Sequence, residues 1–365
     1  MSNSRLALSV LIAGLVAGCA ATSGGNNSGD DNMTGDDGGG DDGPVPFTNG
    51  VSTLAGMAQP GYKDGVRRIA TFANPVAVAY RDGIVYVADF DNGKIRAIDA
   101  DTHETRTVVS QKGFARPFGM VFADDGTLYV STDNDANGAH NPMSGTVWRV
   151  DVNAGTATVV ANAIGRPRGL VMLPDGRLAA ADYQHFVIET IDVHSGKVTT
   201  VAGAWDTPGM AEGLGTAARF ASPYTMVLRS DGKLLVADYD NNRLRLVGLD
   251  GATSTLAGTT AAGFADGAMN TAVFNKPQAL SMADNGDIYL TDTGNFRIRK
   301  IVGDQIQTIA GNGTAGYVDN DNPLSAEIYG IEGLSVVPDG SMLYFADGSR
   351  GTDAPYNRVR QLKLQ

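Results

Sequence analysis

This 365-residue chain contains a single cysteine and only four histidines. One cysteine cannot form an intramolecular disulfide, so a disulfide-stapled scaffold is excluded. Basic residues are also scarce, because 28 Lys and Arg stand against 40 Asp and Glu and give a formal net charge of −12. A chain of this charge with no long basic stripe lacks the electrostatic footprint of a nucleic-acid-binding protein. Anionic membrane surfaces are disfavoured for the same reason.

The apolar run near the N-terminus, residues 6–18, is too short to span a bilayer but suits the core of a signal peptide. It ends at Cys19 in the sequence Leu-Val-Ala-Gly-Cys, which resembles the bacterial lipobox, where the cysteine is lipidated and becomes the mature N-terminus. Ala20 follows, and by resemblance to proteobacterial lipoproteins this favours the outer membrane. Residues 1–19 are therefore expected to be a lipoprotein signal peptide, with an ordinary secretory signal and a chance cysteine as the alternative.

Residues 20–46 are dominated by Gly, Asp, Asn, Ser and Thr. They cannot bury enough apolar surface to offset chain entropy, so we expect a flexible acidic tether. A calcium-binding tract is the alternative, although no rigid loop is evident to hold the ion. Residues 47–365 then form one large all-β domain.

Asx-Gly pairs recur in that domain, each between two short runs of β-forming residues. Such a pair predicts a tight hairpin with a type I′ turn, in which both central residues take positive φ. Six copies predict six similar antiparallel sheets. The pairs lie at 82–83, 125–126, 175–176, 231–232, 285–286 and 339–340.

Alignment on these turns gives a unit of four strands, named a to d from the axis outwards. The spacing of the units is typical of propeller blades. The last unit has no strand d, whereas a spare strand d, residues 51–56, precedes the first unit. The sequence therefore predicts a six-bladed β-propeller of four-stranded antiparallel blades, closed by the N-terminal strand. Strand a opens at Pro75, Pro117, Pro167, Pro223, Pro277 and Ile331.

Residues 234–245 (LLVADYDNNRLR) and 288–299 (IYLTDTGNFRIR) resemble NHL repeats. The resemblance covers nearly all of 51–365 but is weaker in blades two and three, where Thr132 replaces the Asp that ends strand b and residues 183–188 lack Asn-x-Arg. It implies a six-bladed propeller, a fold that is widely used as a binding platform and only sometimes as an enzyme.

A carboxylate repeated in five blades is expected to accept backbone N–H groups in the connection between strands b and c, not to catalyse. Three arginines recur with it and are expected to pair locally or face solvent: Arg243, Arg297 and Arg358. The repeated carboxylates are Asp89, Asp182, Asp238, Asp292 and Asp347.

The d–a and b–c loops are expected on one side of the ring, which we call the loop-rich face. Four d–a loops share a Gly-apolar-x-acid motif, and insertions 133–145 and 348–356 lengthen two b–c loops. Rigid scaffolds commonly carry function on such loops. Packing of the loops around apolar anchors is the alternative. The motifs begin at Gly61, Gly209, Gly263 and Gly316.

On this face the residue that follows each strand-opening position should line the axis. Arg168 and Glu332 should lie opposite one another in a six-fold ring. This predicts a polar axial pocket for a small ligand or an extended peptide terminus, with a solvated channel mouth and an ordinary ion pair as the alternative. The axial residues are Val76, Phe118, Arg168, Tyr224, Gln278 and Glu332.

Enzymatic motifs are sparse. Proteins that resemble gluconolactonases hold axial calcium with a Glu, an Asn and an Asp, and of these only Glu332 is present. The sequence from Asp133 through Asp135 to Asn137 matches the start of a calcium loop, but its twelfth position is Ser144 and not Glu. We therefore expect no cofactor, with calcium as a weak alternative.

These observations favour a monomeric, lipid-anchored, non-catalytic binding or interaction module of the cell envelope, most simply on the outer membrane. It would contact the membrane only through its anchor and bind an unidentified protein or small molecule. A lactonase-like hydrolase or lyase using Glu332 and Arg168 is the alternative, and a scaffold subunit of an envelope complex is a third interpretation.

Overall fold

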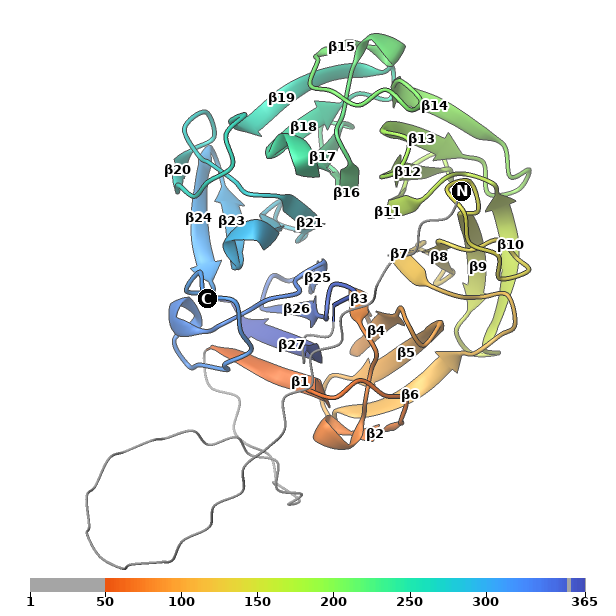
Figure 1. Cartoon of the computed structure of the whole chain (residues 1–365), viewed down its shortest axis with the longest axis vertical. Helices are drawn as coiled ribbons and strands as arrows, with labels where there is room; N and C mark the ends of the chain where they lie inside the picture. The colour runs from red at the N-terminus through yellow and green to blue at the C-terminus, as the bar shows by residue number, and fades with distance from the viewer. Residues whose placement is uncertain (1–49, 353–355, 365) are drawn as a thin grey trace, which may run out of the picture. The chain divides into compact units, whose positions relative to one another are not determined.

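The computed structural model describes residues 50–352 and 356–364, within the compact unit Pro46–Gln365. In this unit six antiparallel sheets surround a central axis, which confirms the predicted all-β, six-bladed propeller (Figure 1). The predicted signal peptide, Cys19 and the tether lie outside the described residues. Within the described ranges no helix is long and apolar enough to cross a membrane.

Each blade contributes one strand to each of four concentric positions. The inner strands a are β3 (Pro75–Arg81), β7 (Pro117–Phe122), β11 (Pro167–Met172), β16 (Pro223–Leu228), β21 (Pro277–Met282) and β25 (Gly333–Val336). Strands b are β4 (Ile84–Asp89), β8 (Leu128–Thr132), β12 (Leu178–Asp182), β17 (Leu234–Asp238), β22 (Ile288–Asp292) and β26 (Met342–Asp347). Strands c are β5 (Lys94–Asp99), β9 (Thr146–Asp151), β13 (Val187–Ile191), β18 (Arg243–Val247), β23 (Arg297–Val302) and β27 (Asn357–Lys363). Strands d are β6 (Glu104–Val109), β10 (Thr156–Asn162), β14 (Val198–Gly203), β19 (Ala252–Gly258), β24 (Gln305–Ala310) and β1 (Val51–Met57).

Three blades gain a fifth strand of two residues, which the sequence did not predict. Each belongs to a long d–a loop that pairs with strand d of the blade it enters. These strands are β2 (Gly65–Val66), β15 (Gly213–Leu214) and β20 (Gly267–Ala268). The helical segments are single 3₁₀ turns, η1 (Arg67–Ile69), η2 (Gly215–Ala217), η3 (Tyr239–Asn241), η4 (Thr293–Asn295) and η5 (Pro323–Ser325).

The Asx-Gly hairpins form as predicted, but the type I′ expectation holds only in the first blade. Asp82 and Gly83 have φ of 50° and 83°, and Arg81 pairs directly with Ile84. In the other five hairpins only the Gly has positive φ. There the Gly amide donates to a carbonyl three residues earlier, as from Gly126 to Ala123 at 3.0 Å. The extra residue before the Asx-Gly pair converts the turn to a longer, bulged form.

The predicted ring closure is confirmed. Strand β1 pairs antiparallel with β27, with Val51 opposite Leu362 and Met57 opposite Asn357. Figure 1 shows the first strand of the chain beside the last, on the outside of the sixth blade. Leu54 of β1 is fully buried, so this strand contributes to the core as well as to the sheet edge.

The core consists of apolar layers between neighbouring sheets. Leu54 and Val359 of blade six pack with Phe72 and Val87 of blade one in such a layer. Near the axis the inner strands approach one another closely at glycines. A Cβ on Gly119 would lie 2.6 Å from the carbonyl oxygen of Arg168, so any larger residue there would push β7 away from β11.

Closure of the ring by β1 predicts that this strand contributes to the stability of the domain. A variant that starts at Pro60 loses Leu54 and Val51 from the core and exposes the edge of β27, so we expect its melting temperature to fall by on the order of 10 °C. A variant that starts at Gly50 keeps β1 and is the matched control. Thermal unfolding followed by circular dichroism measures both, and equal melting temperatures would refute closure by β1.

Candidate functional site

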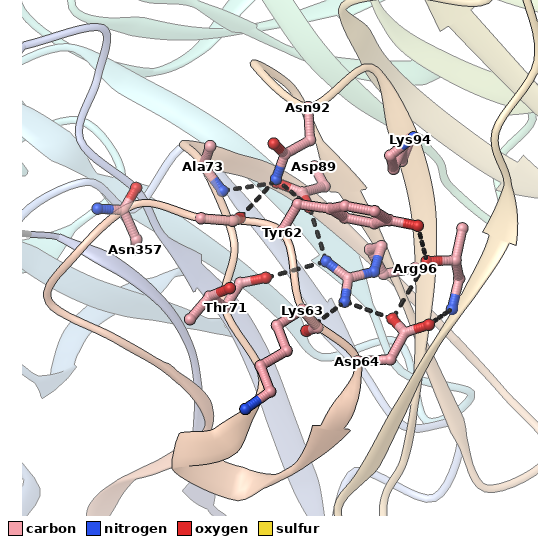
Figure 2. Close-up of polar contacts among 12 residues, drawn as sticks. Tyr62, Lys63, Asp64, Thr71, Ala73, Asp89, Asn92, Lys94, Arg96 and Asn357 are labelled. Carbon is pink, nitrogen blue, oxygen red and sulfur yellow. Dashed lines mark hydrogen bonds and ion pairs between the residues drawn. The ribbon is translucent and has the colours of Figure 1, made fainter.

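The repeated Asp residues form buried ion pairs with arginines of strand c. In blade one Asp89 Oδ2 lies 2.9 Å from Arg96 Nη1, and both side chains are fully buried. Asp89 also accepts hydrogen bonds from the Ala73 amide through Oδ1 and from Asn92 through Oδ2, each at 2.8 Å (Figure 2). The matching pairs are Arg245–Asp238 at 2.8 Å, Arg299–Asp292 at 2.7 Å and Arg360–Asp347 at 2.9 Å.

The structural role expected for these carboxylates is correct. The predicted source of their N–H donors, the b–c connection, holds only in blade three. Outside blade three the backbone N–H groups that they accept come from the d–a loop, as with Ala73, and not from the b–c connection. Sequence reasoning also singled out Arg297 and missed the buried Arg299. Both arginines lie on the same face of strand c as the Asp on strand b, and the second is the one that the d–a loop covers, as the Ala265 carbonyl covers Arg299 at 2.7 Å.

The shared motif of the d–a loops has a structural function as well. Arg96 Nη2 donates to Asp64 at 2.6 Å and to the Lys63 carbonyl at 2.8 Å (Figure 2). Asp64 also accepts from the Thr107 amide on strand d at 3.1 Å. The residues common to these loops therefore fasten each loop to its blade, around buried anchors. The anchors are Phe72, Phe220, Phe274 and Ile328.

Blades two and three lack the buried arginine. In blade two Trp148 occupies its position and donates its indole N–H to Thr132 at 2.9 Å. In blade three Glu189 takes the place of the arginine, beside Asp182. His185 contacts Asp182 at 2.7 Å and stacks on Trp205 with centroids 4.2 Å apart. Burial, reinforced by the Asp182 carboxylate, raises the pKa of Glu189 to about 7.

The axial residues meet at the inner strands, but most of them fill the axis. Phe118, Arg168, Tyr224 and Gln278 are all buried, and only Glu332 is partly exposed. The Arg168 guanidinium lies 3.9 Å from the centroid of the Phe118 ring, which packs edge-on against Tyr224 at 5.6 Å. Gln278 donates a hydrogen bond to Glu332. We call these five residues, together with Asp133, the axial cluster.

Arg168 pairs with Asp133, a contact that sequence reasoning missed. The Arg168 Nη2–Asp133 Oδ2 distance is 3.0 Å, and Arg166 contacts the same oxygen at 2.6 Å. Burial alone would raise the pKa of Asp133, but the two arginines outweigh it and hold that pKa below its usual value. No ion pair joins Arg168 to Glu332 within the described ranges. The b–c insertion 133–145 thus brings a carboxylate to the axis from a neighbouring blade.

Several buried polar atoms of the axial cluster have no hydrogen-bond partner among the described residues. They are Arg168 Nε and Nη1, Gln278 Oε1 and Asp133 Oδ1. Such atoms are rare in folded proteins and mark a strained, functional or solvent-filled position. Burial also raises the pKa of the Glu332 carboxyl, against the opposing effects of Arg168, Arg350 and Gln278. The cluster therefore offers unpaired donors beside unpaired acceptors.

Asp133 and Asp135, the carboxylates of the possible calcium loop, are engaged by different partners. Asp133 faces the two arginines, whereas Asp135 Oδ1 accepts the amides of Asn137 at 2.9 Å and Ala139 at 2.8 Å. Nowhere in residues 50–352 and 356–364 do three or more His, Cys, Asp or Glu side chains gather as a metal site.

Comparison with known proteins agrees with the repeat pattern. The NHL repeat family matches residues 274–301, which include strands a to c of blade five. The chain is 29% identical over 178 residues to protein SUPPRESSOR OF QUENCHING 1, chloroplastic, of Arabidopsis thaliana, covering 45% of this chain and 16% of that protein. It is 26% identical over 302 residues to cattle (Bos taurus) NHL repeat-containing protein 2, covering 67% of this chain and 41% of that protein. It thus spans less than half the length of either relative.

Solved structures share the fold at low identity. An auxiliary nutrient binding protein from Bacteroides thetaiotaomicron has a TM-score of 0.65 and 16% identity, covering 85% of this chain and 75% of that one. A streptogramin B lyase has a TM-score of 0.54 and 14% identity, covering 87% and 98%. The chain is therefore a six-bladed β-propeller in which residues 274–301 match the NHL repeat family.

The raised pKa of Glu189 predicts a pH-dependent destabilisation. Its folded value of about 7 lies above the unfolded value of 4.5, so the folded state binds the proton more tightly and the free energy of unfolding falls as pH rises between them. Glu189→Gln stays neutral, and we expect it to gain about 3 kcal/mol over the native protein at about pH 8 and little at about pH 4. Urea unfolding at both pH values measures this.

The exposed Glu104→Gln is the matched control for that charge change, and its effect should be small at both pH values. A gain from Glu189→Gln that is the same at both pH values would contradict the assigned cause.

Proposed function

We propose that this protein is a non-catalytic binding module of the bacterial cell envelope, anchored through a lipid on Cys19 and binding its ligand on the loop-rich face. The observation that carries the proposal is the set of unpaired buried donors and acceptors in the axial cluster. Each such group costs about 1–3 kcal/mol when it is left without a partner, so a polar ligand or ordered water that pairs them is strongly favoured.

The chemistry of the axial cluster limits what can bind. Arg168 presents N–H donors, whereas Gln278 presents a carbonyl acceptor and Glu332 lies at the accessible side. A ligand that both donates and accepts hydrogen bonds satisfies these groups together, as a small polar molecule or a peptide terminus does. Phe118 and Tyr224 supply an apolar wall beside them. Such a combination of apolar surface and few converging polar groups is typical of binding sites.

The comparisons support a binding role without specifying it. One similar structure is named an auxiliary nutrient binding protein, and another from Bacteroides ovatus, with 17% identity, carries the same name. A binding role for those proteins matches the class of function proposed here.

A lactonase-like hydrolase or lyase is the second candidate, favoured by the raised pKa of Glu332, because a carboxyl with such a pKa can act as a general acid or base. Arg168 would then orient the substrate. A streptogramin B lyase shares the fold. The binding role is preferred because Arg166 and Arg168 already pair with Asp133. Glu332 is then the one carboxylate of the axial cluster that remains for acid–base chemistry.

The axial site is tested with a panel of sugars, amino acids and short peptides in a thermal-shift screen. We expect at least one compound to raise the melting temperature by several degrees, because a ligand at 100 times its dissociation constant adds about 2.7 kcal/mol. Glu332→Gln should abolish this shift, whereas Glu327→Gln, the same change elsewhere on the loop-rich face, should preserve it. Lactone turnover with stoichiometric calcium, both lost in Glu332→Gln, would establish the enzymatic alternative instead.

The anchor is tested by Cys19→Ser. We expect this change to release the protein from the membrane fraction and to remove the lipid mass increment, because a serine cannot form the thioether to diacylglycerol. The neighbouring change Ala20→Ser should leave the protein membrane-bound. Unchanged membrane partition of Cys19→Ser, with no lipid mass in the native protein, would show that the leader is an ordinary secretory signal.

A further inference from the structure

A cavity lies on the loop-rich face, between blades one and two. It has a volume of about 510 Å³, is open to solvent, and is bordered by the b–c loop after β4 and by the connection from β6 to β7. Its lining includes three cationic side chains, Lys94, Lys112 and Arg116, and one carboxylate, Asp91. We call it the inter-blade pocket.

The connection that forms this pocket is short, which leaves its cations without fixed carboxylate partners. In blades one, five and six the long d–a loop supplies an acid that binds the buried arginine, as Asp64 binds Arg96. The connection 110–116 contains no acid. Among the described residues none of the three cations forms an ion pair with a carboxylate. Lys94 donates only to the neutral Ser110 hydroxyl, at 2.6 Å.

The position of Lys94 shows how this blade departs from the repeat. Lys94 lies opposite Asp89, as Arg243 lies opposite Asp238 and Arg297 opposite Asp292. Arg297 folds onto backbone carbonyls, donating to Asn295 and Asn312. Lys94 instead rests over the Tyr62 ring, 4.5 Å from its centroid, with its ammonium at the pocket.

The pocket concentrates positive charge on a protein of the opposite sign. The chain has a net charge of −12, yet three cations face one carboxylate here. One of its lining residues, Phe114, is buried and packs edge-on against Trp148 at 5.5 Å. Low-dielectric walls around charges of one sign focus the field and attract counter-ions.

We propose that the inter-blade pocket binds an anionic group, a carboxylate or a phosphate carried by a small molecule. Lys94 and Lys112 supply ammonium donors, and Arg116 supplies a planar guanidinium suited to paired oxygen atoms. Asp91 also lines the pocket. Its negative charge disfavours ligands of high negative charge density.

The inter-blade pocket adjoins the axial cluster through one side chain. The Phe90 ring has Arg116 at 5.3 Å on the pocket side and Arg168 at 5.9 Å on the axial side. Phe90 also packs edge-on against Phe118 at 6.1 Å. One ligand can therefore place an anionic group in the pocket and a polar group at the axis, although the anion site stands without the axial one.

The test is a calorimetric titration of the purified protein with inorganic phosphate and, separately, with acetate. We expect saturable binding of at least one anion that weakens at high ionic strength. The double variant Lys112→Gln/Arg116→Gln should weaken it by about tenfold or more, because two charge-assisted contacts are lost. The tighter of the two anions identifies phosphate or carboxylate as the preferred group.

Two controls separate this site from general charge effects and from the axial proposal. Lys63→Gln/Lys233→Gln makes the same change in net charge outside the pocket, and Glu332→Gln alters the axis, so both should bind the anion within about twofold of the native protein. Absence of anion binding, or equal loss in both double variants, overturns the proposal. Loss with Glu332→Gln alone would also overturn it, by placing the anion at the axis.

Discussion

The buried Asp–Arg pair is the interaction on which the architecture of the loop-rich face depends. Arg96, Arg245, Arg299 and Arg360 are fully buried, and a buried guanidinium is tolerated when a carboxylate balances its charge and its terminal nitrogens are hydrogen-bonded. The partners come from strand b and from the d–a loop, segments that are separate in sequence. A blade and its covering loop therefore reach their native arrangement only together, and the loops are held in place with little freedom.

The two blades without this pair are adjacent, and both proposed binding sites lie beside them. Blade two contributes Phe118 and Asp133 to the axis and borders the inter-blade pocket, and blade three contributes Arg168. Where the repeat is regular, its polar residues are used for structure. Where it departs, Arg168 at the axis keeps both Nε and Nη1 without a hydrogen-bond partner among the described residues. Local departure from an otherwise consistent pattern is where function is expected.

Much of the fold could be predicted from the sequence because its signals are local and repeated. Asx-Gly turns, strand-opening prolines and the match between residues 51–56 and other outer strands gave blade number and closure. The candidate site was less predictable. Both arginines of Arg-x-Arg lie on the same face of strand c, and which of them is buried depends on how the d–a loop covers that face. The pairing of Arg168 with Asp133 depends on the path of insertion 133–145, and four of the other blades have no such insertion.

The pairing of β1 with β27 also determines at which point of chain synthesis the native fold can be completed. These strands lie about three hundred residues apart, and contacts so distant in sequence form slowly because the intervening chain must first be ordered. When a polypeptide crosses a membrane with its N-terminus leading, β1 emerges first and β27 emerges last. Until then β1 has an unpaired hydrogen-bonding edge, which favours association with other chains. For a chain that is exported in this order, the ring can close only after the final segment has arrived.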